Sequence, residues 1–196
     1  MYQIRVHGRG GQGVVTAAEL IAWAAIADGR YALAFPSFGS ERTGAPVEAY
    51  CRIDDQPIRS REPVTEPDLV VVLDPTLLRQ RFVFDGIKSG GTALINTAGT
   101  DTSAADSQLM PHSVGVRTVP ATEFARQRTG RSLPNAAMLG AVAAATGIVP
   151  LAAVRDAIAA RFPGPVAEAN AAAATDAFEY LRSAAHADRE VNRVHT

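Results

Sequence analysis

The sequence predicts a three-layer, Rossmann-like α/β fold, in which a largely parallel sheet has helices on both faces and is followed by a helical C-terminal part. Three observations carry this prediction. A short alternating strand at residues 2–7 runs into a glycine-rich turn and then into an alanine-rich helix. A continuous apolar run at residues 68–74 is typical of a strand that is covered on both faces. After residue 120, the chain has only helical signals.

Local signals place the elements of the first part of the chain. Gly29 is a good stop for the first helix, in which Trp23 is expected to be a packing anchor. Asp74 and Pro75 have the types and order of an N-cap and a first-turn proline, and we prefer this capping role to catalysis. The resulting prediction is a helix at 14–28, strands at 31–35, 47–53, 68–74, 92–96 and 114–119, and an irregular loop at 36–46.

The second part of the chain is predicted to be helical. Glycines at 130 and 147 and the Pro163-Gly164-Pro165 break separate helices at 121–129, 135–146, 151–161 and 167–185. Alanine-dense helices of this kind suit close packing, and we favour their use at a subunit interface. We expect one domain over residues 1–187, followed by a charged, frayed tail at 188–196.

Composition excludes several classes of function. With 19 basic and 20 acidic side chains, the chain has no global field that would attract nucleic acid or an anionic membrane. No apolar run approaches the length that spans a bilayer. Because the amino terminus leads directly into a strand, we expect no signal peptide and a cytoplasmic location.

The chain offers little for metal or redox chemistry of its own. Cys51 is the only cysteine, so we expect no disulfide and no iron–sulfur cluster held by this chain. We expect Cys51 to be a small buried residue rather than a reactive thiol. The four histidines are scattered without the short spacing of metal ligands. We therefore predict no metal ligand and no catalytic residue in this chain.

The candidate binding site is the glycine turn. Gly8, Gly10 and Gly13 fit the pattern G-x-G-x-x-G, in which bare backbone and a helix start can receive an anion such as a phosphate. The alternative is a purely structural strand-to-helix turn. A dinucleotide site should also have an acidic residue at the end of the second strand, and that residue is missing here. The binding residues predicted in the turn are Gly8, Arg9, Gly10, Gly11, Gln12 and Gly13.

The loop at 36–46 is the second part of the candidate site. Strand ends in open α/β sheets converge on one crevice, so Phe38, Glu41 and Arg42 are expected to line the crevice of the glycine turn. The alternative is that Glu41 and Arg42 are solvated loop charges.

Several ordered segments resemble the gamma subunit, or gamma domain, of the pyruvate/2-oxoacid:ferredoxin oxidoreductase family. They fall in order over about the first 160 residues, so the resemblance is far more specific than the glycine turn alone. The segments are RVHGRGGQGVVTAA (5–18), AFPSFGSERTGAPV (34–47), RIDDQPIR (52–59), EPD (66–68), LDPTLL (73–78) and NAAMLG (135–140).

The resemblance implies a non-autonomous subunit of a thiamine-dependent enzyme. That enzyme would oxidise a 2-oxoacid to acyl-CoA and pass electrons to ferredoxin or another acceptor. Partner subunits would bring thiamine diphosphate, Mg²⁺ and iron–sulfur clusters, while this chain completes the coenzyme A side of the active site. Arg9 and Arg42 would contact the phosphates of coenzyme A. Pyruvate is the leading substrate, with aryl or branched oxoacids and 2-oxoglutarate open. The alternative is an independent Rossmann-type nucleotide-binding protein.

Overall fold

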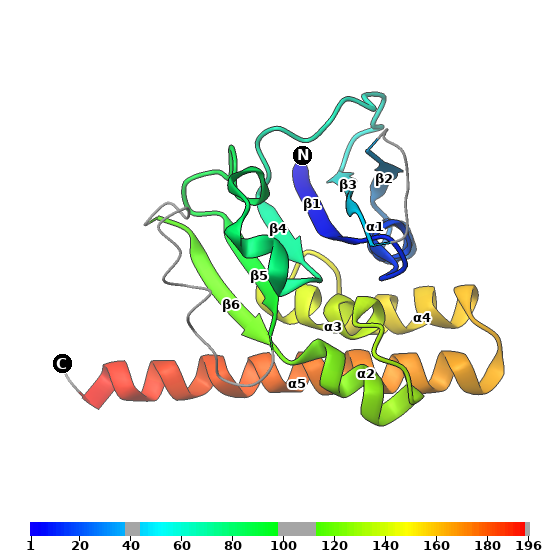
Figure 1. Cartoon of the computed structure of the whole chain (residues 1–196), viewed down its shortest axis with the longest axis vertical. Coiled ribbons are helices and arrows are strands. Elements are labelled where there is room, and N and C mark those ends of the chain that lie inside the picture. Colours follow the sequence, from blue (N-terminus) through cyan, green and yellow to red (C-terminus); the bar gives the residue numbers. More distant parts are fainter. Residues whose placement is uncertain (38–43, 98–112, 195–196) are drawn as a thin grey trace.

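The computed structural model describes residues 1–37, 44–97 and 113–194, and for Arg81 and residues 186–194 it describes the backbone alone. Within these residues, six strands form one sheet in the order β2-β3-β1-β4-β5-β6 (Figure 1). Strands β1, β4, β5 and β6 pair in parallel, whereas β3 is antiparallel to both β1 and β2. The strands are β1 Tyr2–Arg9, β2 Tyr31–Pro36, β3 Pro46–Asp54, β4 Leu69–Val72, β5 Thr92–Asn96 and β6 Gly115–Val119.

The two faces of the sheet are covered differently. Helices α1 and α3 contact the strands on one face, where α5 also reaches β6, and α2 and α4 pack behind them. Two short 3₁₀ helices, η1 and η2, cover the other face beside β4 and β5. The predicted α/β fold with a largely parallel sheet and a helical C-terminal part is confirmed. The helices are α1 Val14–Ala27, η1 Pro75–Arg79, η2 Arg81–Val83, α2 Ala121–Thr129, α3 Asn135–Thr146, α4 Leu151–Arg161 and α5 Gly164–Val194.

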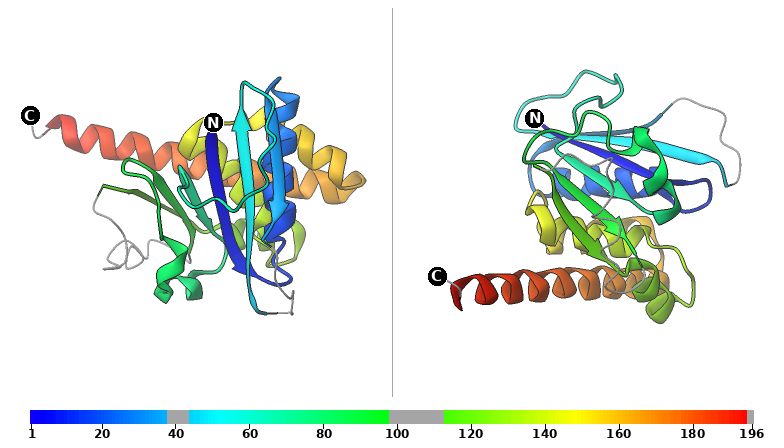
Figure 2. Two further views of the ribbon diagram at one scale, coloured as in Figure 1. Left: turned by 90° about the horizontal axis from the view of Figure 1, so that it is seen from above. Right: turned by 60° about the vertical axis from the view of Figure 1, so that its left-hand side comes forward.

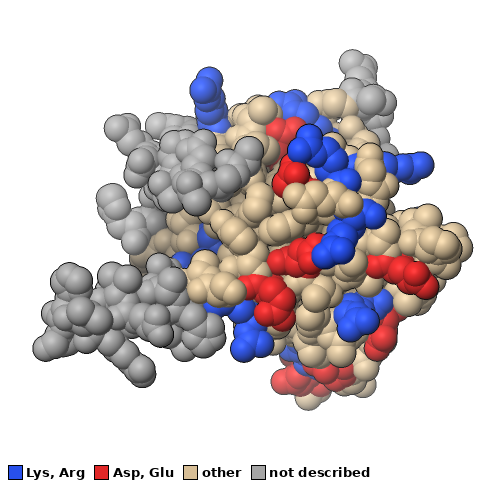
Figure 3. Space-filling view, turned by 90° about the horizontal axis from the view of Figure 1, so that it is seen from below, with Lys and Arg blue, Asp and Glu red and all other residues tan. Residues whose placement is uncertain are grey.

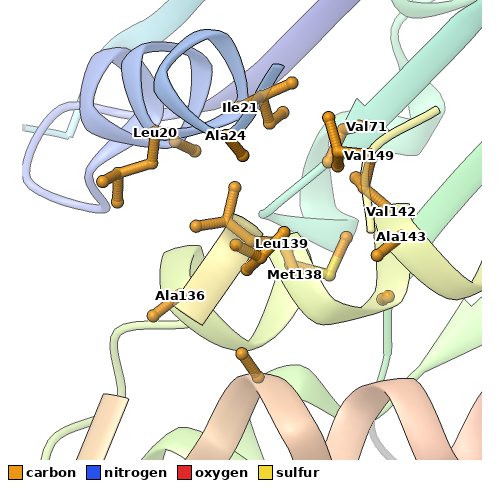
Figure 4. Close-up of a cluster of buried hydrophobic side chains, with 14 of the residues drawn as sticks. Leu20, Ile21, Ala24, Val71, Ala136, Met138, Leu139, Val142, Ala143 and Val149 are labelled. Carbon is orange, nitrogen blue, oxygen red and sulfur yellow. The ribbon is translucent and has the colours of Figure 1, made fainter. Parts of the chain in front are cut away.

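The main core lies between the sheet and the α-helices. Leu20 and Ile21 of α1, Met138 and Leu139 of α3, and Val71 of β4 belong to one cluster between the helices and the sheet (Figure 4). All five side chains are almost completely buried. Removal of this much apolar surface from water is the main force that holds α1 and α3 on the sheet.

Strand β4 is the most deeply buried strand, as its apolar run predicts. It lies between β1 and β5, and every residue from Leu69 to Leu73 is buried. Its Val70 and Val72 face Leu77 and Phe84 on the 3₁₀ side. Both faces are therefore covered, and the prediction that this segment lies inside the sheet is confirmed.

The alanine-dense helices α3 and α5 pack on each other within the chain. A side chain added at Gly140 of α3 would collide with the backbone at Ala174 of α5. Ala173, Ala174 and Ala177 are buried on the facing side of α5. The small residues of this contact serve internal packing, because glycine and alanine let two helix backbones approach closely. The use of other alanines of these helices at a subunit interface stays a prediction.

Two helical features differ from the sequence prediction. Trp23 is 41% exposed on α1, so its predicted role as a packing anchor is wrong. Helix α5 continues past residue 185, where its end was predicted, and reaches Val194. Its C-terminal part extends beyond the rest of the fold (Figures 1 and 2).

Two buried arginines attach irregular segments to the 3₁₀ side of the sheet. Arg5 of β1 donates to the carbonyl oxygens of Val64, Val83 and Asp85. Arg52 of β3 donates to the carbonyls of Ser60 and Pro63 and to the Gln3 side chain. Each cation is buried with hydrogen-bond acceptors around it, which offsets the cost of its desolvation.

Candidate functional site

The glycine turn connects β1 to α1 with two residues in conformations that favour glycine. Gly11 has φ +95° and Gly13 has φ +75°, and Gly13 is the N-cap of α1. No side chain caps the helix, and its first turn has no acidic residue. The hydrogen bond from Ala17 N–H to the Gly13 carbonyl closes the first turn of the helix. The start of α1 therefore presents amide groups without a side-chain acceptor.

Two of the glycines are also required by close packing. A Cβ atom at Gly8 would lie 2.6 Å from Cγ2 of Val14 and 3.2 Å from Cβ of Leu73. A Cβ atom at Gly13 would overlap the side-chain amide of Asn135, the first residue of α3. At Gly11, by contrast, an added Cβ would meet nothing within 4 Å. Gly8 and Gly13 are therefore explained by packing, whereas Gly11 leaves an open approach for a ligand.

A cluster of four polar residues holds the turn against the end of β4; we call Arg9, Gln12, Asp74 and Thr76 the Arg9–Asp74 cluster. Gln12 Oε1 accepts from the Arg9 backbone N–H, and Gln12 Nε2 donates to Asp74 Oδ2 at 2.9 Å. Arg9 Nε lies 3.2 Å from Asp74 Oδ2, and Arg9 Nη2 donates to Thr76 Oγ1 at 2.8 Å. The cluster thus attaches the glycine turn to the residues that follow β4.

Asp74 also caps η1, as the sequence predicts. Its Oδ1 accepts from the Thr76 N–H and hydroxyl. Burial tends to raise the pKa of Asp74, but the hydrogen bonds from Thr76 and Gln12 and the charge of Arg9 outweigh it and lower the pKa. Asp74 therefore stays ionised and compensates part of the Arg9 charge, although 31% of the Arg9 side chain is exposed.

The end of the 36–46 loop is bonded directly to the turn. Gly10 N–H donates to the Ala45 carbonyl, and Gly44 N–H donates to the Gly10 carbonyl. Arg9 Nη1 donates to the Gly44 carbonyl at 3.0 Å. The structure thus brings the glycine turn and the last residues of this loop together. Residues 38–43 lie outside the described residues, so the prediction that Phe38, Glu41 and Arg42 line the same crevice stays a prediction.

Asn96 and Asn135 complete the surroundings of the turn, and neither was among the predicted site residues. Asn96 donates to the Leu73 carbonyl and accepts from the Thr122 N–H, so it joins β5 to β4 and to the start of α2. Asn135 lies against Gly13. The sequence could have indicated Asn135, Asp74 and Thr76 as site residues, because all three lie in segments that carry the family resemblance.

His7, the residue directly before Gly8 in β1, is a buried histidine. Its Nε2 accepts from Arg5 Nε at 3.1 Å, and its Nδ1 lies 3.4 Å from Glu48 Oε1 without a well-aligned hydrogen bond. Burial, with a smaller contribution from the Arg5 charge, lowers the pKa of His7 to about 3. His7 is therefore neutral at physiological pH.

The described residues show neither a metal cluster nor a membrane span. Nowhere among them do three or more His, Cys, Asp or Glu side chains gather as metal ligands would. None of their helices is both long and apolar enough to cross a bilayer. On the helical side, basic and acidic side chains are interspersed (Figure 3), in keeping with the balanced charge of the sequence.

The fold and the turn define a class: an α/β protein with a glycine-rich turn and an uncapped helix start at the carboxyl end of a largely parallel sheet. Residues 3–180 match the family described as pyruvate ferredoxin/flavodoxin oxidoreductase. The chain belongs to this family, as a gamma-type subunit of a 2-oxoacid:ferredoxin oxidoreductase.

Relatives and solved structures agree with this assignment. The chain is 48% identical to the pyruvate synthase subunit PorC of Methanothermobacter marburgensis, over 93% of this chain and 98% of that protein. It is also 48% identical to the pyruvate/ketoisovalerate oxidoreductases common subunit gamma of Thermococcus litoralis, over 91% and 96%. The crystal structure of the Thermotoga maritima pyruvate oxidoreductase subunit PORC superposes with a TM-score of 0.79 at 39% identity, covering 91% of this chain and 95% of that one.

Proposed function

We propose that this subunit completes the coenzyme A side of the active site in a multisubunit enzyme that oxidises a 2-oxoacid to acyl-CoA. Partner subunits supply thiamine diphosphate, Mg²⁺ and iron–sulfur clusters, and electrons leave through them to ferredoxin or another acceptor. Pyruvate is the leading substrate, because relatives at 48% identity are named for pyruvate. We place the enzyme in the cytoplasm.

One observation carries the proposal. Three segments that are far apart in the sequence, at residues 9–13, 44–45 and 73–76, are joined by hydrogen bonds around the uncapped start of α1. They meet at the ends of β1 and β4. The strands that follow β1 in the chain lie on both sides of it within the sheet, with β3 and β2 on one side and β4, β5 and β6 on the other. In open α/β sheets, ligands bind at such a position.

The chemistry of this position fits the phosphates of coenzyme A. Amide groups at a helix start favour an anion through hydrogen bonds and the helix dipole. Gly11 leaves the approach open, because its position is exposed and lacks a side chain. Arg9 adds a guanidinium that is partly exposed, so we propose that it contacts a phosphate while Asp74 and Thr76 hold its orientation. Arg42 is proposed as a second phosphate contact.

The independent nucleotide-binding alternative lacks a comparable observation. Strand β2 ends at Pro36 and is followed by Ser37, so no acidic residue stands at its end to bind a ribose. Asp28 has roughly the spacing of such a residue, but it is the C-cap of α1.

The test is Arg9→Ala in the assembled complex, with two acyl acceptors compared. Coenzyme A contains phosphates, whereas pantetheine has the same thiol arm without them. We expect the KM for coenzyme A to rise roughly 5- to 150-fold, the range for loss of a charge-assisted contact. The KM for pantetheine and for the 2-oxoacid should stay unchanged. Arg128→Ala, which removes an exposed arginine of α2, is the control.

Two results would overturn the proposal. An equal rise in the KM of coenzyme A and pantetheine would mean that Arg9 only shapes the turn. An unchanged KM together with dissociation of the complex, seen by size-exclusion chromatography, would make the turn an assembly surface.

A further inference from the structure

Strand β2 forms an open edge of the sheet with an unusual composition. In the described part of the chain, β2 pairs with β3 alone, and Figure 1 shows it at the end of the sheet. Its six residues, YALAFP, include no charged side chain. Edge strands normally carry charges, prolines, bulges or covering segments that prevent pairing with another strand. In β2 the one such residue is Pro36, at the end of the strand and outside the stretch 31–35. An uncharged edge is therefore prepared to pair.

The register of β2 decides which backbone groups face outward. Ser37 N–H donates to the Glu48 carbonyl of β3, and the pairing continues from there with a period of two residues. Residues 31, 33 and 35 therefore direct their backbone groups to β3. Ala32 and Ala34 direct their N–H and C=O groups to the open edge.

The sequence of this edge is nearly the same in both directions. Tyr31-Ala32-Leu33-Ala34-Phe35 reads as aromatic, alanine, leucine, alanine, aromatic. If two copies pair antiparallel about Leu33, each Ala32 faces Ala34 of the other copy, and their outward N–H and C=O groups are correctly placed to exchange hydrogen bonds. Tyr31 then lies opposite the aromatic Phe35, a favourable cross-strand pair.

Exposed apolar side chains next to β2 support a larger contact. Tyr31 is 50% exposed, and Ile26 of α1 is 52% exposed. Trp23 is exposed on the same helix, which packs directly against β2. Two short strands alone bury too little area for a stable interface, so the contact has to extend onto neighbouring surface such as α1, which exposes apolar side chains.

We infer that β2 is a homotypic docking edge, through which two copies of this subunit join antiparallel about Leu33 into one continuous sheet. The pair has the two-fold symmetry that is commonest among oligomers, because the same strand serves both partners. This contact lies at the β2 edge and is independent of the role assigned to the glycine turn.

A disulfide across the symmetry axis tests this register. In a non-hydrogen-bonded antiparallel pair, opposite Cα atoms are about 4.5 Å apart, within disulfide range. Leu33→Cys should therefore form a disulfide-linked dimer on mild oxidation, both in the purified full chain and in the assembled complex. Tyr31→Cys is the matched control, because residue 31 and its copy would be separated by about 13 Å. The native Cys51 is fully buried and does not compete.

A charge at the same position tests the contact without cross-linking. Leu33→Lys places two like charges opposite each other and should raise the dimer dissociation constant by about tenfold or more, measured by analytical ultracentrifugation. Leu33→Met, of similar length but uncharged, should keep the dimer. Three results would each overturn the inference: no dimer with Leu33→Cys, equal cross-linking by Tyr31→Cys, or a disulfide to another subunit of the complex.

Discussion

The guanidinium of Arg9 lies 3.2 Å from the carboxylate of Asp74, and this ion pair joins the turn after β1 to the segment after β4. The two residues are 65 positions apart, so the pair fixes the relative position of the two strand ends. A charge that is predicted to meet a phosphate is thus already held in place by a carboxylate. Such preorganisation reduces the entropy that is lost when a ligand binds.

We first predict that Asp74→Ala destabilises the fold by about 2–3 kcal/mol. The substitution removes the cap of η1, the acceptor of Gln12 Nε2 and the ion partner of Arg9. Urea denaturation of the wild type and the variant measures this loss. Asp176→Ala, which breaks only the surface ion pair with Arg128, should have a smaller effect, and an equal effect would contradict the prediction.

The second prediction concerns acid stability. The pKa of His7 is about 3 in the folded chain, because burial disfavours its charged form, and about 6.5 in an unfolded chain. Below pH 6.5 the unfolded state binds a proton that the folded state does not, so stability falls as the pH decreases. We expect a loss of about 1.4 kcal/mol per pH unit from this group, and about 2 kcal/mol at pH 5.

The variant that checks this assignment is His7→Gln, whose side-chain oxygen can still accept from Arg5. Thermal denaturation between pH 5 and 7 should show a shallower dependence of Tm on pH for the variant. The same slope in both proteins would show that other groups cause the acid sensitivity.

The third prediction concerns the crossing of α3 and α5. Alanine has a higher helix propensity than glycine, by about 1 kcal/mol, so propensity alone would make Gly140→Ala stabilising. The added methyl group would instead collide with the backbone at Ala174, and we expect a loss of more than about 3 kcal/mol. Gly90→Ala is the control, since only its positive φ opposes the substitution. The denaturation midpoints of both variants are the measurement. A higher midpoint for Gly140→Ala than for the wild type would show that helix propensity outweighs the collision.

The fourth prediction is that Cys51 is chemically inert in the folded subunit. It is completely buried, and burial raises the pKa of its thiol to about 12, so the reactive thiolate is absent at neutral pH. A chromogenic disulfide reagent should find no reactive thiol in the native chain and one in urea. Rapid labelling of the native chain would contradict this.

Local signals were enough to predict most elements. Gly29, Gly130 and Gly147 end helices α1, α2 and α3 by adopting positive φ, a property of the single residue. The apolar run of β4 predicted its burial because a strand covered on both faces has no polar positions. The cap formed by Asp74 was predictable for the same reason, since its acceptor role depends on its nearest neighbours.

Features that depend on distant contacts could not be predicted in this way. The direction of β3 is set by its pairing with β1 and β2, and no local pattern encodes it. Trp23 lies within an alanine-rich helix, but which side of that helix faces the core depends on the positions of α3 and α4. In the site, the glycines were predicted from their pattern, whereas the approach of Asn135 to Gly13 requires the fold.

The reversed direction of β3 has a consequence for how the subunit can vary. Since β2 and β3 are antiparallel neighbours, β2 ends beside the start of β3, with Ser37 bonded to Glu48. No helix has to move when the connection between these two strand ends changes in length or sequence. The part of the chain beside the glycine turn can therefore be remodelled to suit different partners or substrates while the folded core stays the same.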